Sequence, residues 1–256
     1  MKTTTIGVTD VGCVRSSNED SLGLFPDLNL YIVADGMGGH AAGEVASKMA
    51  VDMIREFFMA HQGRSDTGTP ELTQSSKEAL MPQAITYANQ CIYEAACRDK
   101  SLTGMGTTVV ALLADPTELI IGFVGDSRVY LHNKDQIKQL TRDHSLVNEY
   151  VRQGLLTPEA AESHPLKHIL SRALGTNPKV EVETFKRIPL PGDVLILCSD
   201  GLSNKLAPQA MNAIMMENGN DLEKGGNALV QKAKENGGED NITAILVGYH
   251  ETACDR

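Results

Sequence analysis

The chain has 256 residues, of which 41% are hydrophobic, and this is enough to bury one sizeable core or two small ones. Its 23 basic and 33 acidic residues give a formal charge of −10, which argues against nucleic acid or an anionic membrane as a partner. The acidic excess suits a protein that gathers carboxylates around cations, although solubility alone would also explain it.

The cysteines and the N-terminus indicate the compartment. Five cysteines form no Cys-x-x-Cys pair, which is typical of a reducing compartment and disfavours a disulfide framework or a zinc site. The first residues, MKTTTIGVTD, hold no apolar run, and no segment approaches the ~18 apolar residues of a membrane span. We therefore expect a soluble cytoplasmic protein.

The first half of the chain predicts one strand and two helices. The apolar run Leu30–Ala34 has the length of a buried strand, and apolar residues recur at helical spacing over Ala42–Phe58. The polar stretch His61–Ser76 resembles a linker or a surface loop. A second amphipathic helix is predicted over Lys77–Arg98.

The middle of the chain predicts antiparallel strands followed by an insertion. Strands are expected over Thr107–Ala114 and Leu119–Val124, and a further hairpin turns at Asn133–Asp135. The polar segment Asp143–Gly175, which we call the flap, is expected to be rich in helix, with a helix start at Thr157-Pro158 and a stop at Gly175. It is either a mobile flap beside a site or a pair of packed surface helices.

The last part of the chain predicts strands over Val194–Cys198 and Ile242–Val247, with a helix over Gly225–Glu235 between them. Strands, helices, strands and helices thus follow one another without regular βαβ alternation. We expect an α+β layered fold with antiparallel sheets.

Four acidic residues stand at the ends of predicted strands: Asp35, Asp126, Asp200 and Asp240. A lone Asp-Gly after a strand is more often only a turn, but strand ends cluster at one edge of a layered fold. Converging carboxylates would raise one another's pKa values unless a divalent cation neutralised them. Mg²⁺ and Mn²⁺ prefer oxygen ligands, and a glycine after the Asp lets the main chain approach the ion.

The first of these sites has a competing interpretation. Gly36-x-Gly38-x-x-Ala41 also fits the turn that binds a dinucleotide pyrophosphate at a helix N-terminus. That fold requires a second strand ending in an acidic residue about 20 positions on. A long helix and a polar loop follow instead, so the metal interpretation is favoured.

Seven motifs then appear in order: VRSSNED, VADGMGGH, GMGTT, VGDSR, SRALG, LCSDGL and GGEDNIT. Together they resemble the metal-dependent serine/threonine protein phosphatases of type 2C, the PPM family, and the bacterial single-domain branch most closely. The resemblance runs from about Asp10 to Val247. It implies one phosphatase domain over residues 1–256, folded as a four-layer α/β/β/α sandwich of two antiparallel sheets flanked by helices, with the helical flap inserted.

The resemblance also implies metal ligands. Asp35 resembles the carboxylate that bridges two Mn²⁺ or Mg²⁺ ions, and the Gly36 carbonyl would bind the second ion. Asp200 and Asp240 match the ligands of the first ion. Asp126, together with Asp200, would hold a third ion.

Two further acidic residues, Glu19 and Asp20, match groups that hold metal-bound waters. The implied reaction is hydrolysis of phosphoserine or phosphothreonine by direct attack of a hydroxide that bridges two metals, without a phosphoenzyme. Arg15 is the candidate phosphate clamp, because a guanidinium can hold two phosphate oxygens at once. His40 either protonates the departing seryl or threonyl oxygen, or orients a metal-bound water or caps the helix.

The expected partners are phosphorylated proteins and a cognate serine/threonine kinase, and nothing demands more than a monomer. Three alternatives are less well supported by the sequence. A phosphatase-like binding module should have lost ligands, whereas every carboxylate is present. A hydrolase of small phosphoesters or nucleotides is poorly supported by a chain with 4% aromatic residues and no Trp. Calcium loops are disfavoured, because no D-x-[DN]-x-[DN]-G pattern occurs.

Overall fold

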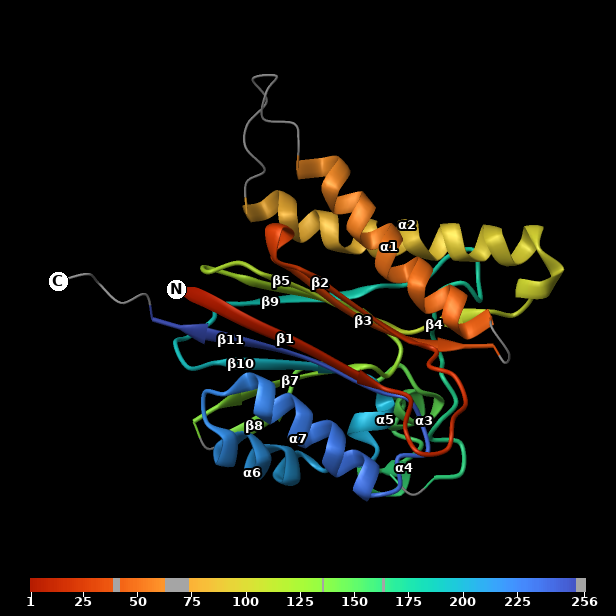
Figure 1. Ribbon diagram of the computed structural model, residues 1–256. Coiled ribbons are helices and arrows are strands. Elements are labelled where there is room, and N and C mark those ends of the chain that lie inside the picture. Colours follow the sequence, from red (N-terminus) through yellow and green to blue (C-terminus); the bar gives the residue numbers. More distant parts are fainter. Residues whose placement is uncertain (39–41, 63–73, 135, 163, 252–256) are drawn as a thin grey trace, which may run out of the picture.

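Two antiparallel sheets pack face to face between two pairs of helices in the computed structural model (Figure 1). It describes residues 1–38, 42–62, 74–134, 136–162 and 164–251. The first sheet has the order β2 (Asp20–Phe25), β3 (Leu30–Met37), β5 (Val109–Ala114), β6 (Leu119–Val124) and β9 (Glu183–Arg187), with β4 (Gly106–Thr107) beside β3. The second has the order β1 (Lys2–Asp10), β11 (Ile242–His250), β10 (Val194–Cys198), β7 (Arg128–Asn133) and β8 (Gln136–Gln139).

Helices cover the outer face of each sheet (Figure 1). The first sheet lies under α1 (Ala42–Gln62) and α2 (Gln74–Arg98), and the second under α6 (Pro208–Asn218) and α7 (Leu222–Glu235). The remaining helices in the described part of the chain are short: α3 (Leu146–Arg152), α4 (Pro158–Glu162), α5 (Asp200–Ser203) and the 3₁₀ turns Pro26–Leu28 and Lys100–Leu102. Among the described residues, no helix is long and apolar enough to cross a membrane.

The alternation of side chains along the central strands produces three buried layers. In β3, Ile32 and Ala34 face the helices, whereas Tyr31 and Val33 face the second sheet. Both faces are covered, so these strands are apolar throughout rather than alternating with polar residues. Each large apolar side chain buried in this way stabilises the fold by about 1.5–3 kcal/mol.

The antiparallel pairing also collects the acidic strand ends. β3 and β6 run in the same direction, so Asp35 and Asp126 lie at the same end of the first sheet. β10 ends and β11 begins at the matching end of the second sheet, where Cys198 pairs with Ala244. This end is on the right in Figure 1, away from the labelled termini.

The α+β sandwich is confirmed, and several predicted elements need correction. The strands β1, β2 and β9 were not predicted, because each lies at a sheet edge and is only partly apolar. Thr107–Ala114 is divided into β4 and β5 at Thr108. The predicted β7–β8 hairpin is present, with Lys134 at φ 55°, while Asp135 lies outside the described residues.

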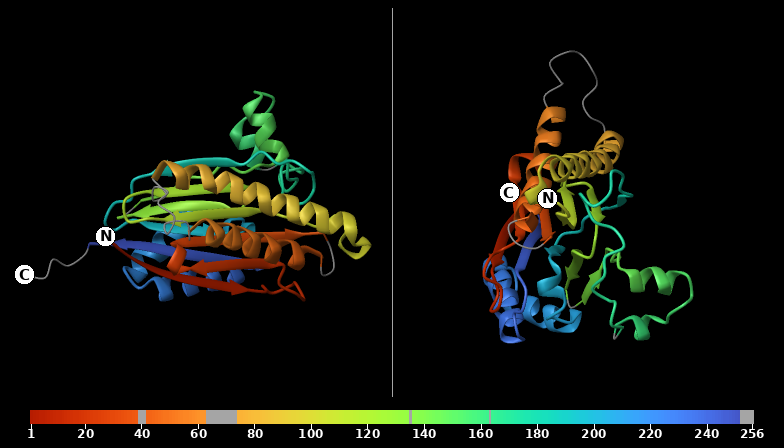
Figure 2. Two further views of the ribbon diagram at one scale, coloured as in Figure 1. Left: turned by 90° about the horizontal axis from the view of Figure 1, so that it is seen from above. Right: turned by 90° about the vertical axis from the view of Figure 1, so that its right-hand side faces the viewer.

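The flap departs most from the expectation. Among its described residues it holds two short helices, α3 and α4, which stand out from the body of the sandwich (Figure 2). The helix start at Thr157-Pro158 is correct, because the Thr157 Oγ1 accepts a hydrogen bond from the Ala160 N–H at 3.3 Å. Gly175 ends no helix: it has φ 82° in the turn that follows the bridge between Thr107 and Leu174. Of the polar stretch before α2, residues 63–73 lie outside the described part.

Candidate active site

A cavity of about 400 Å³ opens at the end of the sandwich where the acidic strand ends meet. Its lining contains seven of the residues predicted for the site: Arg15, Glu19, Asp35, Gly36, Asp126, Asp200 and Asp240. Asp20 lies behind the cavity wall, where β2 pairs with β3 and Asp20 is opposite Asp35. His40 lies outside the described residues.

Asp20 is a buried carboxyl whose two oxygens differ in their hydrogen bonding. Its side chain accepts a hydrogen bond from the Ser199 hydroxyl at 2.8 Å through Oδ2, whereas Oδ1 has no partner among the described residues. Burial raises the pKa of Asp20 to about 7, and the charges of Asp200 and Asp240 add to the effect. An unsatisfied buried carboxylate oxygen is costly and points to a missing water or cation.

The backbone around Asp35 is held in place by two threonines. The Asp35 N–H donates to the Thr108 hydroxyl at 3.1 Å, and the Thr108 N–H donates to the Asp35 carbonyl at 2.9 Å. The Thr107 hydroxyl donates to the same carbonyl at 2.8 Å. Burial raises the pKa of Asp35 well above its ordinary value, and the neighbouring acids, Asp20 first, raise it further.

Gly36 is required by close approach of three backbone segments. A Cβ at Gly36 would lie 2.1 Å from the Gly43 carbonyl oxygen at the start of α1, and the Gly36 N–H donates to the Glu19 carbonyl at 3.1 Å. A Cβ at Gly43 would lie 2.0 Å from Glu19 Oε2, so the Glu19 side chain rests against the same helix start. The glycine after Asp35 therefore brings Glu19, the strand end and α1 together.

Asp126 occupies a tight turn after β6. Gly125 adopts φ 106°, which favours glycine, and the Ser127 hydroxyl hydrogen-bonds the Thr108 hydroxyl at 2.7 Å. The same Thr108 hydroxyl holds the Asp35 N–H, so the two acidic turns share one anchor. Burial raises the pKa of Asp126 to about 7, and the charges of Asp200 and Asp143 raise it as well.

Asp200 and Asp240 come from the second sheet. Burial raises the pKa of Asp200, and the charge of Asp240 raises it further. Asp240 pairs with Arg15 at 2.9 Å, and the Arg15 side chain is 51% exposed at the cavity rim. The four acids from distant strands therefore converge, as the sequence predicts.

The arrangement of these carboxyls fits hydrated divalent ions. The pKa values of Asp20, Asp35 and Asp126 are raised because burial and repulsion by neighbouring carboxyls act together, and a cation would relieve both. No three Asp, Glu, His or Cys side chains of the described part converge closely enough to enclose an ion by themselves. Mg²⁺ is commonly held by one or two carboxylates and keeps several waters, so an open cavity lined by carboxyls suits it.

Comparison with known proteins settles the family. The family model described as protein phosphatase 2C matches residues 15–246. The chain belongs to the protein phosphatase 2C family. It is therefore a serine/threonine phosphoprotein phosphatase, as its sequence motifs predict.

Individual relatives agree over nearly the whole length. A serine/threonine phosphatase stp from Listeria innocua is 43% identical over 242 residues, which are 93% of each chain. The serine/threonine phosphatase PstP/Ppp of Mycobacterium tuberculosis superposes with a TM-score of 0.84 at 32% identity, covering 97% of this chain and 99% of that one. The catalytic domain of PstP in complex with 2 manganese ions superposes with a TM-score of 0.80 at 31% identity, covering 97% and 99%.

This 2C phosphatase also uses residues that sequence reasoning missed. The Asn241 amide donates to the carbonyls of Val11 (3.0 Å) and Ser17 (2.9 Å), and its oxygen accepts the Glu19 N–H at 2.8 Å. It thereby fixes the segment that carries Arg15 and Glu19. Asn241 stands in GGEDNIT directly after Asp240, and its side-chain amide was the only local signal.

A second cavity of about 520 Å³ joins the first beside the flap. Asp126, His168 and Asp200 line both cavities. The second cavity is bounded by α3 and α4 of the flap, through Val147 and Ala161, and by the segment after α5. The flap of this phosphatase thus borders the acidic site, which favours its interpretation as a flap over that of packed surface helices.

Proposed function

We propose that this phosphatase hydrolyses phosphoserine and phosphothreonine on cytoplasmic proteins with the help of two divalent ions, Mn²⁺ or Mg²⁺, and a third beside Asp126. The observation that carries the proposal is the group of buried carboxyls with raised pKa values, Asp35, Asp126 and Asp200, that face one cavity, with an arginine at the rim. The manganese complex of the PstP catalytic domain supports the choice of metal.

The carboxyls divide by the sheet that carries them. Asp35, with the backbone of Gly36, lies at the end of β3 and would bridge two ions. Asp200 and Asp240 would hold the first ion from the second sheet, and Asp126 with Asp200 the third. Glu19 and Asp20 would hold waters of the ions, a role that suits the unpartnered Oδ1 of Asp20. The support for these roles is the shared cavity and the sequence motifs.

When bound, the ions would lower the pKa of a water between them and neutralise charge on the phosphoryl group. The chain contributes binding and orientation. Arg15 Nη2 lies 2.9 Å from Asp240, and from this rim position its guanidinium would hold two phosphate oxygens. Asp240 holds the guanidinium in place through this ion pair, and its charge raises the pKa of Arg15. His40, outside the described residues, stays a predicted general acid or orienting group.

We also infer the extent of the domain, the oligomeric state, the location and the partners of the enzyme. We infer one phosphatase domain over residues 1–256, because the family match extends over residues 15–246. We infer a monomer in the cytoplasm that opposes a serine/threonine kinase. The formal charge of −10 supports the further inference that it has no nucleic-acid or anionic-membrane partner.

Phosphate release after removal of metal tests the proposal. The protein is stripped with chelator and incubated with a phosphothreonine peptide or with a nucleotide, each with and without Mn²⁺. We expect release from the peptide only with Mn²⁺, and far less from the nucleotide. Folded wild-type protein that releases no phosphate from several peptides with Mn²⁺ would contradict the protein phosphatase assignment, and preference for the nucleotide would indicate a small-phosphoester hydrolase.

A further inference from the structure

The turn that carries Asp126 is held from two sides. On one side, Thr108 contacts it through Ser127, and a Cβ at Gly125 would lie 2.6 Å from the Thr108 Cβ. On the other side lies His144, the second residue of the flap. The Gly125 N–H donates to His144 Nδ1 at 3.1 Å, and the His144 N–H donates to the Gly125 carbonyl at 2.9 Å. One residue therefore binds both the N–H and the carbonyl of Gly125, the residue directly before Asp126.

The hydrogen bond with Gly125 identifies the tautomer of His144. A backbone amide only donates, so Nδ1 must accept and the proton of the neutral ring resides on Nε2. The imidazole is 4% exposed and stacks on Phe123, with ring centroids 5.1 Å apart. Burial lowers the pKa of His144, and Arg172 lowers it further, which favours the neutral ring.

The other ring nitrogen, Nε2, connects to the flap helix through charged residues. His144 Nε2 lies 3.1 Å from Glu183 Oε1, without the alignment of a straight hydrogen bond, and has no other partner among the described residues. Arg172 contacts the same carboxylate oxygen at 3.5 Å. The Arg172 guanidinium also lies 3.8 Å from Glu149 of α3 and 3.1 Å from Glu181. Arg172 thus joins the start of β9 to the flap helix.

The backbone at the base of the flap strengthens the same connection. The Ser171 N–H donates to the His144 carbonyl at 2.8 Å, and the Leu146 N–H donates to the Ile169 carbonyl at 2.8 Å. The two ends of the flap therefore run side by side, and His144 lies where they meet the turn after β6. Nothing in the reaction proposed above uses this side chain.

We propose that His144 is a positioning residue that holds the Gly125 backbone N–H through Nδ1 and ties the turn that carries Asp126 to the flap through Glu183 and Arg172. The proposal rests on the proposed function in one respect, the role of Asp126 as a ligand of a divalent ion. His144 itself touches neither substrate nor metal. It is a further determinant of how Asp126 is presented to the cavity.

Two variants distinguish the contact made by Nδ1 from the contact made by Nε2. Asn places its Oδ1 near the position of histidine Nδ1, so His144→Asn can still accept the Gly125 N–H. Gln places its terminal amide near Nε2, so His144→Gln keeps the side that faces Glu183 and leaves the Gly125 N–H unpaired. The measurement is Mn²⁺ binding to chelator-stripped protein by calorimetry, with circular dichroism to confirm that each variant folds.

We expect His144→Asn to bind Mn²⁺ within about twofold of wild type and His144→Gln to weaken the weakest binding step about tenfold, the effect of one unsatisfied buried donor. In the background of Asp126→Asn, which removes that step directly, His144→Gln should weaken Mn²⁺ binding no further. Equal Mn²⁺ affinity in folded His144→Gln and His144→Asn, or an additional loss in the double variant, would overturn the proposal.

Turnover provides a second measurement and separates this proposal from the proposed function. With phosphothreonine peptide at saturating Mn²⁺, His144→Gln should lower kcat/KM more than His144→Asn does. If the wild type bound Mn²⁺ but hydrolysed no peptide, the proposed function would fail, while the binding comparison would still decide the role of His144.

Discussion

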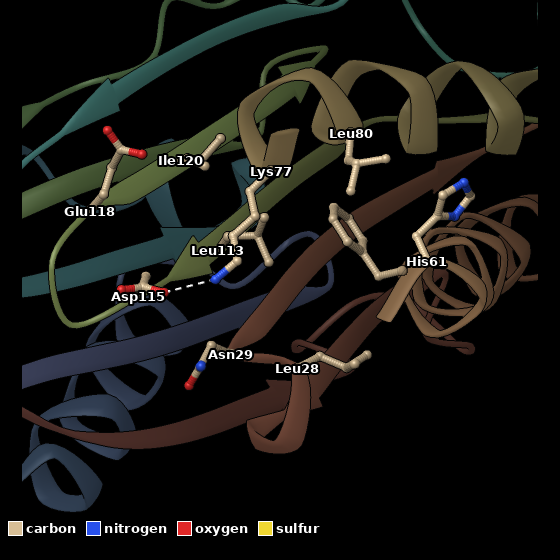
Figure 3. A pocket seen from close by; sticks show the side chains of 10 residues that line it. Leu28, Asn29, His61, Lys77, Leu80, Leu113, Asp115, Glu118 and Ile120 are labelled. Atoms are coloured by element: carbon tan, nitrogen blue, oxygen red, sulfur yellow. Dashed lines mark hydrogen bonds and ion pairs between the residues drawn. The ribbon is translucent and has the colours of Figure 1, made fainter. Parts of the chain in front are cut away.

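Acidic side chains stand at both ends of the sandwich, and the two ends differ in how these charges are balanced. At the end opposite the catalytic cavity, Asp115 lines a cavity of about 80 Å³ and accepts a hydrogen bond from Lys77 at 2.9 Å (Figure 3). The Thr117 N–H and hydroxyl also donate to it, at 3.1 and 2.9 Å. Burial alone would raise the pKa of Asp115, but these hydrogen bonds outweigh it and lower the pKa.

At the catalytic end the balance is reversed. Asp126 follows β6 just as Asp115 follows β5, yet its nearest influences are burial and other carboxyls, and its pKa rises to about 7. The position at a strand end is therefore shared, and the counter-charge is what differs. The charge of Asp115 is balanced within the chain by Lys77. Carboxyls act on Asp126 more strongly than its basic neighbour Arg128 does, so balancing its charge requires a cation from outside.

The largest expected difference between the two ends is in the activity of variants that each lack one acid. Asp35→Asn removes the proposed bridging carboxylate and should lower kcat/KM for a phosphothreonine peptide by about a thousandfold or more, since metal stabilisation contributes several kcal/mol. Asp115→Asn, the matched control, should stay within about twofold of wild type. Similar losses in the two variants, measured at saturating Mn²⁺, would remove the distinction between the ends.

Arg15 should show the next largest effect. Arg15→Ala removes a charged clamp for phosphate oxygens and should lower kcat/KM about a hundredfold, while Mn²⁺ binding by calorimetry stays near wild type. Arg98→Ala is the control, because Arg98 makes an exposed ion pair with Glu94 on α2. Arg15→Ala protein that works as well as the Arg98→Ala protein would exclude Arg15 as the clamp.

The pH dependence of stability should also separate the two ends. Folded Asp20 has a pKa of about 7 against 3.8 when unfolded, so the folded state binds more protons between these values. Without metal, the stability that Asp20 and Asp126 contribute is present below about pH 4 and is lost as the pH rises through 7. The melting temperature of the stripped protein should therefore fall by roughly 5 °C between pH 5 and pH 8.

Two additions to that experiment test whether the buried acids cause the fall in melting temperature. Added Mn²⁺ should reduce the fall, because the ion stabilises the ionised carboxyls. Asp20→Asn should also reduce it, because an amide does not titrate. A melting temperature of the stripped protein that rises steadily from pH 5 to pH 8 would show that the buried acids are not the dominant groups.

The smallest effect is expected at the end opposite the cavity. Lys77→Met leaves Asp115 without its basic partner and should lower the free energy of unfolding by about 0.5–1 kcal/mol, because the pair is partly exposed. Activity should stay within about twofold of wild type. A loss of activity without a loss of stability would mean that this end takes part in catalysis.

Much of the fold and the acidic site was predictable because the decisive signals are local. Asp35 and Asp200 each follow a buried apolar run and precede a glycine, and this pattern is visible within a few residues. The central strands are covered on both faces and are therefore apolar throughout. Short apolar runs in the sequence were enough to identify them. The edge strands β1 and β9 were not predicted from the sequence, because one face of each meets solvent or polar groups.

The residues that organise the site could not be found in this way. Asn241 holds the Glu19 N–H across 222 residues of sequence, and Thr108 holds the Asp35 N–H across 73. A polar side chain with a distant backbone partner leaves no periodic pattern around it. His144 is similar: its contact with Gly125 depends on where the base of the flap meets β6, which only the tertiary structure defines.

A crystal structure of the protein grown with Mn²⁺, with the anomalous signal of manganese measured, tests the central claim most directly. We expect at least two manganese ions in the cavity lined by Asp35, Asp126, Asp200 and Asp240, with Asp35 between two of them, and none beside Asp115. A cavity without manganese at saturating Mn²⁺, or ions bound at the Lys77–Asp115 end instead, would contradict the account.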